Sequence, residues 1–244
     1  MNQNQEIKMQ LLKEFGISSD KKSVDFCREA YKFMTESDNP SPSFSPQCQV
    51  SKDPVAVDLG LPSGTLWCDR NVCAMSPEDY GAFFSWGNVE PHFPKKDNMD
   101  WGDDDNAFDY KFNSEEYKKT PGYKLEGNID AAHDAATVNL GEPWRMPTED
   151  DFQELYDNCD WTRKTVNGVN GYLVTSKING NSLFFPCSGY GHNASWDSRG
   201  ANGYYWSASF GSAADARRLG FRSGGVYPQS HDARFCGVAV RPVQ

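Results

Sequence analysis

The chain has 244 residues, a net charge of -10, 14% aromatic residues, 21 glycines and 14 prolines. With a mean hydropathy of -0.71, this composition favours a loop-rich globular domain over a helical bundle or a chain that is disordered throughout. The acidic balance argues against general affinity for the phosphate backbone of nucleic acids or for anionic lipid.

The charge is unevenly distributed along the chain. Residues 207–244 contain five Arg and two Asp and carry +3, which leaves -13 on residues 1–206. The C-terminal segment is therefore chemically distinct from the rest of the chain.

Residues 1–36 place apolar side chains at helical spacing in two stretches, 7–15 and 24–34. We predict a short helical N-terminal segment, which either packs on the main domain or docks the chain to a larger assembly. It contains no apolar run of signal-peptide length, and no part of the chain approaches the ~18 apolar residues of a membrane span. We expect a protein that is cytoplasmic or virion-associated and does not insert into a membrane.

Residues 37–54 hold four prolines among serines, which favours an extended linker over packed elements. The main domain is therefore predicted to span residues 55–244. Seven cysteines, an odd number without paired short spacings, do not imply a disulfide framework.

Within the main domain the pattern predicts short strands and few helices. The sequence VAVDLGLPSGTLWC (55–68) is typical of a hairpin, residues 87–128 are polar and loop-like, and Thr148 with Asp151 predicts the start of a helix. Further strands are predicted at 171–176, 182–186, 203–209, 216–221 and 237–243. The fold class is therefore α+β, with a small, twisted, mostly antiparallel sheet and long loops.

Four motifs occur in order: VDLGLPSGTLW (57–67), YGAFFSWG (80–87), WRMPT (144–148), and YWS (205–207) together with GVAVRPV (237–243). In this succession the chain resembles the Fibrobacter-type major paralogous domain, a domain typical of Bacteroidetes. The resemblance covers residues 55–244 and implies a C-type-lectin-like fold.

Some proteins with that fold are the variable proteins of diversity-generating retroelements, including phage and prophage proteins. In these proteins adenine-directed mutagenesis rewrites codons near the C-terminus. Here no Asn follows Asn202, and Lys, Glu, Met and Trp are absent after Trp206. The residue types that are common in the segment can be reached by replacing adenines of an Asn codon, whereas the four absent types cannot. The resemblance therefore implies a display protein of receptor or adhesin type with a variable C-terminal surface, and an undiversified adhesin or glycan-binding module is the alternative.

The strand pattern of this segment predicts which side chains face outward. Leu219 and Phe221 share one strand face, so Arg218, Gly220 and Arg222 lie on the other. Arginine suits recognition of proteins or glycans, although charged residues on a strand also serve simply as a solvated face. Residues 223–232 are predicted to form a turn-rich loop with Tyr227 and His231 at its rim. The predicted ligand-binding residues are Phe210, Ser212, Asp215, Arg218, Gly220, Arg222, Gly225, Tyr227, Ser230, His231, Asp232, Phe235 and Cys236.

Other residues of the motifs are predicted to hold the scaffold. The tryptophans at 67, 86, 144 and 206 and the valines at 238, 240 and 243 are expected in the core, and Arg241 is expected to satisfy buried carbonyl groups. Substitutions of core side chains lower the free energy of unfolding far more than substitutions on the surface do. A surface can therefore vary only if the stability of the domain comes from residues outside that surface.

The sequence gives little support for catalysis or for a cofactor. The four histidines lack the spacing of a zinc site, and the acidic run at 103–105 lacks the alternating ligands of a calcium loop. Formylglycine-generating enzymes share the fold and suggest a copper-bound cysteine pair as the remote alternative. Cys236 stands alone near the C-terminus, with Cys187 far away in sequence, so we expect a non-enzyme without catalytic residues, metal or cofactor.

Overall fold

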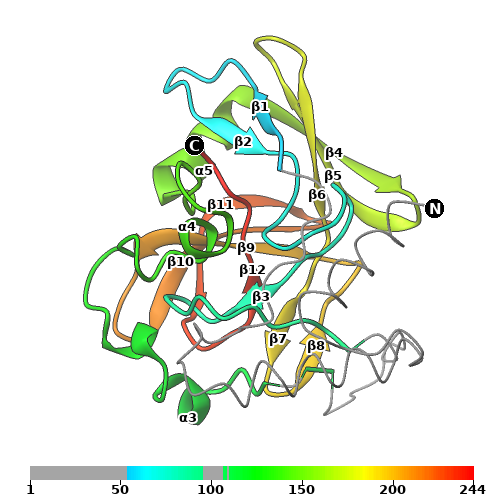
Figure 1. The fold of residues 1–244 in the computed structure, drawn as a ribbon. Coiled ribbons are helices and arrows are strands. Elements are labelled where there is room, and N and C mark those ends of the chain that lie inside the picture. Colours follow the sequence, from blue (N-terminus) through cyan, green and yellow to red (C-terminus); the bar gives the residue numbers. More distant parts are fainter. Residues whose placement is uncertain (1–53, 96–106, 109) are drawn as a thin grey trace, which may run out of the picture. The chain divides into compact units, whose positions relative to one another are not determined.

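A computed structural model describes residues 54–95, 107, 108 and 110–244 (Figure 1). The chain divides into two units, Met1–Ser45 and Pro46–Gln244, and every described residue belongs to the second. The predicted helical segment at 1–36, the linker apart from Pro54, and the acidic run at 103–105 lie outside the described residues.

The largest sheet has five strands in the order β11 (Gly225–Ala233), β10 (Asp215–Arg222), β9 (Gly203–Phe210), β12 (Val238–Ala239) and β3 (Phe83–Phe84). Neighbouring strands are antiparallel except for β12 and β9, which are parallel. β10 and β11 form a long hairpin at one edge of this sheet (Figure 1). The hairpin contains most of the segment that we predicted to bind a ligand.

Three smaller sheets complete the strands of the described part. β4 (Cys159–Val166), β5 (Val169–Ser176) and β6 (Ser182–Pro186) form a meander, while β1 (Ala56–Asp58) pairs with β2 (Leu66–Cys68) and β7 (Tyr190–His192) with β8 (Ser195–Asp197). Asn167 and Gly168, with φ of 48° and 83°, form the tight turn between β4 and β5. The α+β class with mostly antiparallel sheets is confirmed.

The helices are short: α3 (Ser114–Tyr117), a 3-10 turn at Pro121–Lys124, α4 (Ala135–Leu140) and α5 (Glu149–Asn158). α5 begins where the sequence predicts. The Thr148 hydroxyl accepts the Asp151 N–H at 3.1 Å, and the Asp151 carboxylate accepts the Thr148 N–H at 2.7 Å. Each group thus satisfies a backbone donor that the first helical turn leaves unpaired.

Several sequence predictions differ from the structure. Residues 225–233 form strand β11 rather than a loop, and β3, β4, β7 and β8 were not predicted. The strand predicted at 237–243 is reduced to Val238–Ala239, and Val243 forms only isolated bridges with Trp67 and Arg145. The ends of the other four predicted strands lie within two residues of the ends of β5, β6, β9 and β10.

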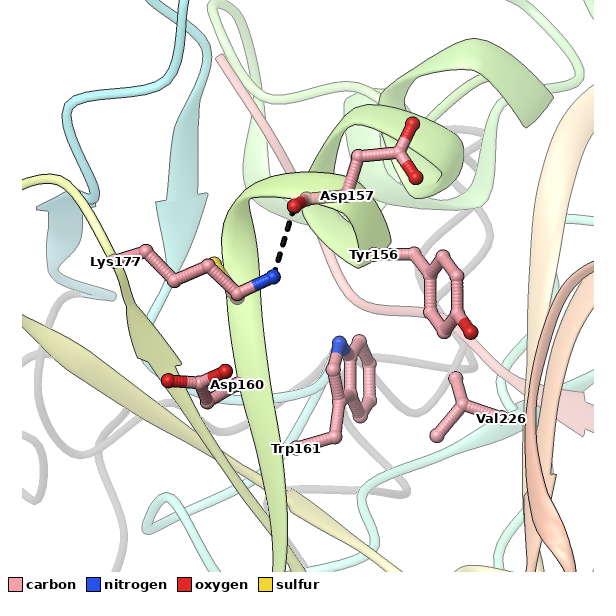
Figure 2. Close-up of a pocket in the computed structure, with 7 residues that line it drawn as sticks. Tyr156, Asp157, Asp160, Trp161, Lys177 and Val226 are labelled. Carbon is pink, nitrogen blue, oxygen red and sulfur yellow. Dashed lines mark hydrogen bonds between the residues drawn. The ribbon is translucent and has the colours of Figure 1, made fainter.

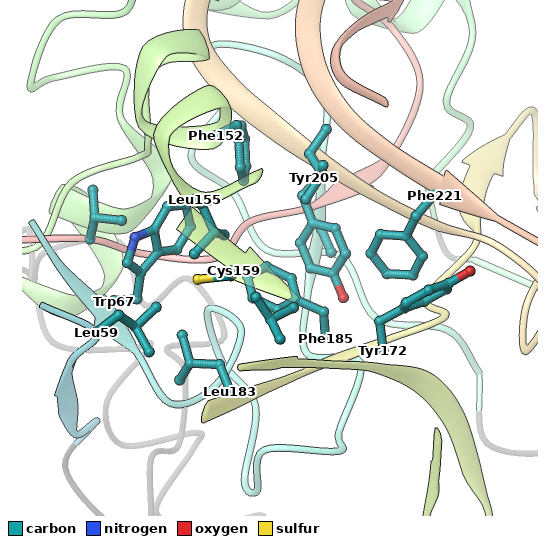
Figure 3. Close-up of a cluster of buried hydrophobic side chains, with 14 of the residues drawn as sticks. Leu59, Trp67, Phe152, Leu155, Cys159, Tyr172, Leu183, Phe185, Tyr205 and Phe221 are labelled. Carbon is teal, nitrogen blue, oxygen red and sulfur yellow. The ribbon is translucent and has the colours of Figure 1, made fainter. Parts of the chain in front are cut away.

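The main hydrophobic cluster lies between α5, the meander and the five-stranded sheet (Figure 3). Phe185 contacts Trp67 and Tyr205, with ring centroids 6.0 and 5.2 Å apart, and Tyr205 stacks on Phe221 at 5.9 Å. The four motif tryptophans and the three C-terminal valines are buried, as predicted. The motifs therefore mark residues that build the core.

Arg241 is completely buried and donates to three acceptors in two segments that are distant in sequence from each other. These are the carbonyl groups of Cys68 (3.1 Å) and Phe184 (2.9 Å) and the side-chain oxygen of Asn71 (2.8 Å). The guanidinium carbon also lies 4.4 Å from the ring centroid of Phe185. The prediction that Arg241 satisfies buried carbonyl groups is confirmed.

The cysteines of the described part occur in two states. Cys68, Cys159, Cys187 and Cys236 are free and buried, whereas Cys73 is disulfide-bonded, a bond that the sequence analysis did not predict. Among the described residues, no helix has both the length and the apolar composition that crossing a lipid bilayer requires.

We predict that Asp151→Asn lowers the free energy of unfolding by about 1–3 kcal/mol, since its carboxylate caps α5 and also accepts from Arg145 Nη1 at 2.7 Å. Asp150→Asn is the control, because Asp150 lies in the same helical turn but is exposed, and its loss should stay within about 0.5 kcal/mol. Denaturant unfolding of both variants measures the difference. Equal losses would contradict the role given to the capping network.

Candidate functional site

Arg218 lies on the central strand of the β9–β10–β11 region and is held on two sides. Its guanidinium carbon is 4.1 Å from the centroid of the Tyr204 ring, and its Nη2 is 3.1 Å from Asp232 Oδ2. The Arg218 side chain is only 12% exposed. Burial lowers the pKa of Arg218, while the carboxylate of Asp232 opposes that shift. The guanidinium stays charged at neutral pH and is fixed by its neighbours.

Arg222 and Tyr227 face each other near the tip of the hairpin. The Arg222 guanidinium carbon lies 5.1 Å from the Tyr227 ring centroid, and both side chains are exposed. A hydrogen bond to Tyr227 raises the pKa of Arg222. This second arginine–tyrosine pair therefore presents its charge to solvent, in contrast to Arg218.

The two pairs line a single depression with a volume of about 190 Å³. We call it the arginine groove; its lining residues are Tyr204, Arg218, Gly220, Phe221, Arg222, Tyr227 and Ser230. Five of the thirteen predicted ligand-binding residues, Arg218, Gly220, Arg222, Tyr227 and Ser230, thus lie together. Asp232 adjoins them through its ion pair with Arg218.

An irregularity in the hairpin shapes the groove. Arg218 pairs with Ser230 but Gly220 pairs with Tyr227, so β11 has one more residue than β10 between these two pairs. Pro228 falls in this bulge on the edge strand, where a missing N–H is tolerated. The sequence 223–232 was predicted as a loop because Gly and Pro are frequent in it, and the bulged edge strand explains both residue types.

Two groove residues were not predicted to bind a ligand: Phe221, which was assigned to the opposite face of its strand, and Tyr204. Tyr204 is the one that the sequence did not place at all. It pairs with Gly220 across β9 and β10, and its ring contacts Arg218. Tyr204 lies two residues before Trp206, so the alternation of a strand places both side chains on one face of β9. This alternation could have been used to choose the face on which Tyr204 lies. However, no local pattern gives the register between β9 and β10, and therefore Tyr204 could not be assigned to the groove.

His231 lies outside the groove. It pairs with Arg217, whose Nε is 3.6 Å from Glu149 Oε1 at the start of α5. Directly opposed residues project to the same sheet face, and consecutive residues alternate. His231 is therefore on the α5 side of the hairpin and does not join Arg218 in one contact surface.

Three predicted residues lie at the far end of the hairpin from Arg222. The Phe210 ring packs against Trp86, with centroids 6.1 Å apart. The Ser212 hydroxyl caps the β9–β10 turn by accepting from the N–H groups of Ala214 and Asp215. These contacts give Phe210, Ser212 and Asp215 local structural roles away from the groove.

The remaining predicted residues are also outside the groove. Gly225 follows the hairpin turn with φ of 147°, and the Phe235 ring lies 5.8 Å from His192. Cys236 is 2% exposed, and burial raises the pKa of its thiol. The assignment of Cys236 to a ligand-contacting surface is therefore wrong, because the chain turns into the core after β11.

Arg234 marks this inward turn. It is 1% exposed, donates to Tyr117 Oη at 3.0 Å and to the carbonyl group of Gly122, and stacks on Trp86 with its guanidinium carbon 4.6 Å from the ring centroid. Arg234 thus belongs to the scaffold although it lies within the segment that we predicted to vary.

A second concavity of about 390 Å³ lies between α5, β4 and β11 (Figure 2). Its lining residues are Tyr156, Asp157, Cys159, Asp160, Trp161, Lys177 and Val226. Lys177 Nζ donates to the Asp157 carbonyl group at 3.0 Å. The concavity mixes both signs of charge, and none of the predicted ligand-binding residues lines it.

Within the described ranges, no group of three or more His, Cys, Asp or Glu side chains is arranged to hold a metal ion. His133 contacts Asp130 at 2.8 Å, while Asp134 caps α4 and accepts from the Met146 N–H. His133 and Asp134 are adjacent in sequence but have separate partners. They therefore do not form a catalytic pair in which the carboxylate orients a histidine base.

No family model, curated protein or solved structure matches the chain.

We predict a favourable coupling energy of about 1–2 kcal/mol between Arg218 and Tyr204 in a double-mutant cycle with Arg218→Met and Tyr204→Leu, since the pair is largely desolvated. The same cycle for Arg222→Met and Tyr227→Leu should give a clearly smaller value, because that pair is exposed to solvent. Denaturant unfolding provides all the free energies. A coupling near zero for the first pair would show that Arg218 is not fixed by Tyr204.

Proposed function

We propose that the chain is a ligand-binding display protein with a C-type-lectin-like fold, and that the arginine groove is the centre of a variable surface for a protein or glycan on a cell surface. The observation that carries this proposal is the separation of roles in β10. Leu219 and Phe221 belong to the main hydrophobic cluster, and Phe221 also forms part of the groove wall, while Arg218, Gly220 and Arg222 line the groove and do not belong to that cluster. A contact surface can therefore change while the residues beneath it are retained.

The fold supports this proposal. The mostly antiparallel sheets, short helices and long connections agree with the C-type-lectin-like fold that the motifs imply. The motif residues Trp67, Trp86, Trp144 and Trp206 are buried, so the resemblance covers the scaffold. Apart from Tyr204, the groove residues lie between YWS (205–207) and GVAVRPV (237–243), in the segment that varies in the retroelement-diversified proteins that the chain resembles.

The chemistry of the groove suits recognition rather than catalysis. Tyrosine supplies a large contact area at a small entropic cost, and arginine supplies planar hydrogen bonding and stacking. Both residue types are enriched among the energetically dominant residues of protein interfaces. The arginine groove combines two of each, with a serine hydroxyl beside them.

The remote alternative is an oxidase of the formylglycine-generating type. That chemistry needs a pair of cysteine thiolates on copper. Burial raises the pKa of Cys187 to about 11 and also raises the pKa of Cys236, which disfavours the thiolate form of both. These thiols have different hydrogen-bond acceptors, Ala201 O and Asp232 Oδ1. Their surroundings favour a non-enzyme that needs no cofactor.

The proposal predicts where closely related copies of the encoding locus differ. Sequencing the locus across a population should place most differences at outward-facing positions of the C-terminal segment, including the exposed Arg222 and Tyr227 and the partly buried Ser230. Leu219, Phe221 and Arg234 should be unchanged, since each is buried.

Differences spread evenly over residues 55–244 would contradict diversification and leave an undiversified adhesin or glycan-binding module as the function. Copper-dependent oxidase turnover that is lost in Cys236→Ser would instead support an enzyme.

A further inference from the structure

Arg218 has hydrogen-bonding capacity that the described residues leave unused. Its Nη2 reaches Asp232, but Nε and Nη1 are buried and have no hydrogen-bond partner within the described part of the chain. Buried donors are normally paired, because an unpaired donor loses its water without compensation. A guanidinium group with two unpaired donors beside a groove is therefore suited to an acceptor that comes from outside the chain.

Gly220 provides the space in front of Arg218. A Cβ atom at residue 220 would lie 2.7 Å from Arg218 Nη1 and 3.5 Å from the nearest atom of the Tyr204 ring. Any side chain at this position would thus fill the groove at the point where Nη1 faces it. The backbone at Gly220 is not left-handed, so the need for glycine here arises from space rather than from backbone conformation.

The charges of the groove select the sign of the ligand. Arg218 and Arg222 are cationic, Asp232 compensates one of them, and the other lining side chains are uncharged. The groove therefore has an excess of one positive charge. A singly charged carboxylate balances this excess, whereas a doubly charged phosphate would place an additional negative charge near Asp232.

We infer that the arginine groove binds a carboxylate group, which accepts hydrogen bonds from Arg218 and Arg222. The inference rests on the proposed ligand-binding role of the groove and adds the chemical class of the ligand. The planar guanidinium matches the two oxygens of a carboxylate. The hydroxyl groups of Ser230 and Tyr227 line the same depression and are available as further donors. The volume of about 190 Å³ accommodates one small acidic group rather than a whole macromolecular chain.

The probe for this inference is propionate, which carries a single carboxylate, with its neutral amide propionamide as the matched control ligand. Titration of the full chain is followed through the arginine side-chain N–H signals in NMR spectra, with the Arg218 signal assigned from its loss in Arg218→Lys. Propionate should shift the Arg218 signal saturably, with a dissociation constant on the order of millimolar, and added salt should weaken the binding. Propionamide should bind at least tenfold more weakly.

Two variants and a control test the location of the site. Gly220→Ala fills the groove without removing a charge, and the close atom is the end of a flexible side chain, so the fold should be retained while propionate affinity falls at least tenfold. Arg222→Gln should reduce the affinity severalfold. Arg217→Ala removes a neighbouring arginine of the same strand that does not line the groove, and it should change the affinity by less than twofold.

Equal binding of propionate and propionamide, or unchanged propionate binding in Gly220→Ala, would overturn the carboxylate assignment. The proposed function fails by a different result, since it depends on where the copies of the locus differ. A groove that binds propionate in a chain whose locus does not vary would keep the carboxylate site and exclude diversification.

Discussion

The buried guanidinium group of Arg241 is the constraint on which the arrangement of the domain depends. It joins the carbonyl group of Cys68 in β2 and the side chain of Asn71 just after β2 to the carbonyl group of Phe184 in β6, and β2 and β6 share no sheet. Two residues earlier, β12 pairs with β9, which in turn carries β10. Because an arginine cannot lose its charge inside a protein, removing any of its three acceptors would leave a buried charge poorly satisfied. The need of the buried Arg241 guanidinium group for hydrogen-bond acceptors thus fixes the position of the sheet that supports the arginine groove.

Four of the five arginines near the C-terminus show how environment separates scaffold from surface. Arg241 and Arg234 are buried, and each donates to backbone carbonyl groups of distant segments. Arg222 is exposed, and its neighbour is Tyr227. Arg218 is intermediate, since it is mostly buried but only part of its hydrogen-bonding capacity is used. The same side chain therefore stabilises the core at two positions and is available to a ligand at the other two.

The sequence predicted those features that local patterns determine. The capping pair at Thr148 and Asp151 predicted the start of α5, and the alternation in residues 216–221 predicted a strand with Arg218 and Arg222 away from the core. β11 was not predicted, because its bulge and its Pro and Gly residues resemble a loop when the partner strand is unknown. Tyr204 and Cys236 could not be placed for the same reason. The register of β9 with β10 and the inward turn after β11 depend on contacts between residues that are distant in sequence.

The central claim is that the groove can change while the core keeps the fold, and thermal unfolding of two variants tests it most directly. A variant with Arg222, Tyr227 and Ser230 all replaced by Ala should unfold within about 3 °C of the parent chain, because these side chains are exposed or only partly buried. Arg241→Met should lower the unfolding temperature by about 5–10 °C, because it leaves two buried carbonyl groups without a donor. A larger loss in the groove variant than in Arg241→Met would contradict the separation of surface from scaffold.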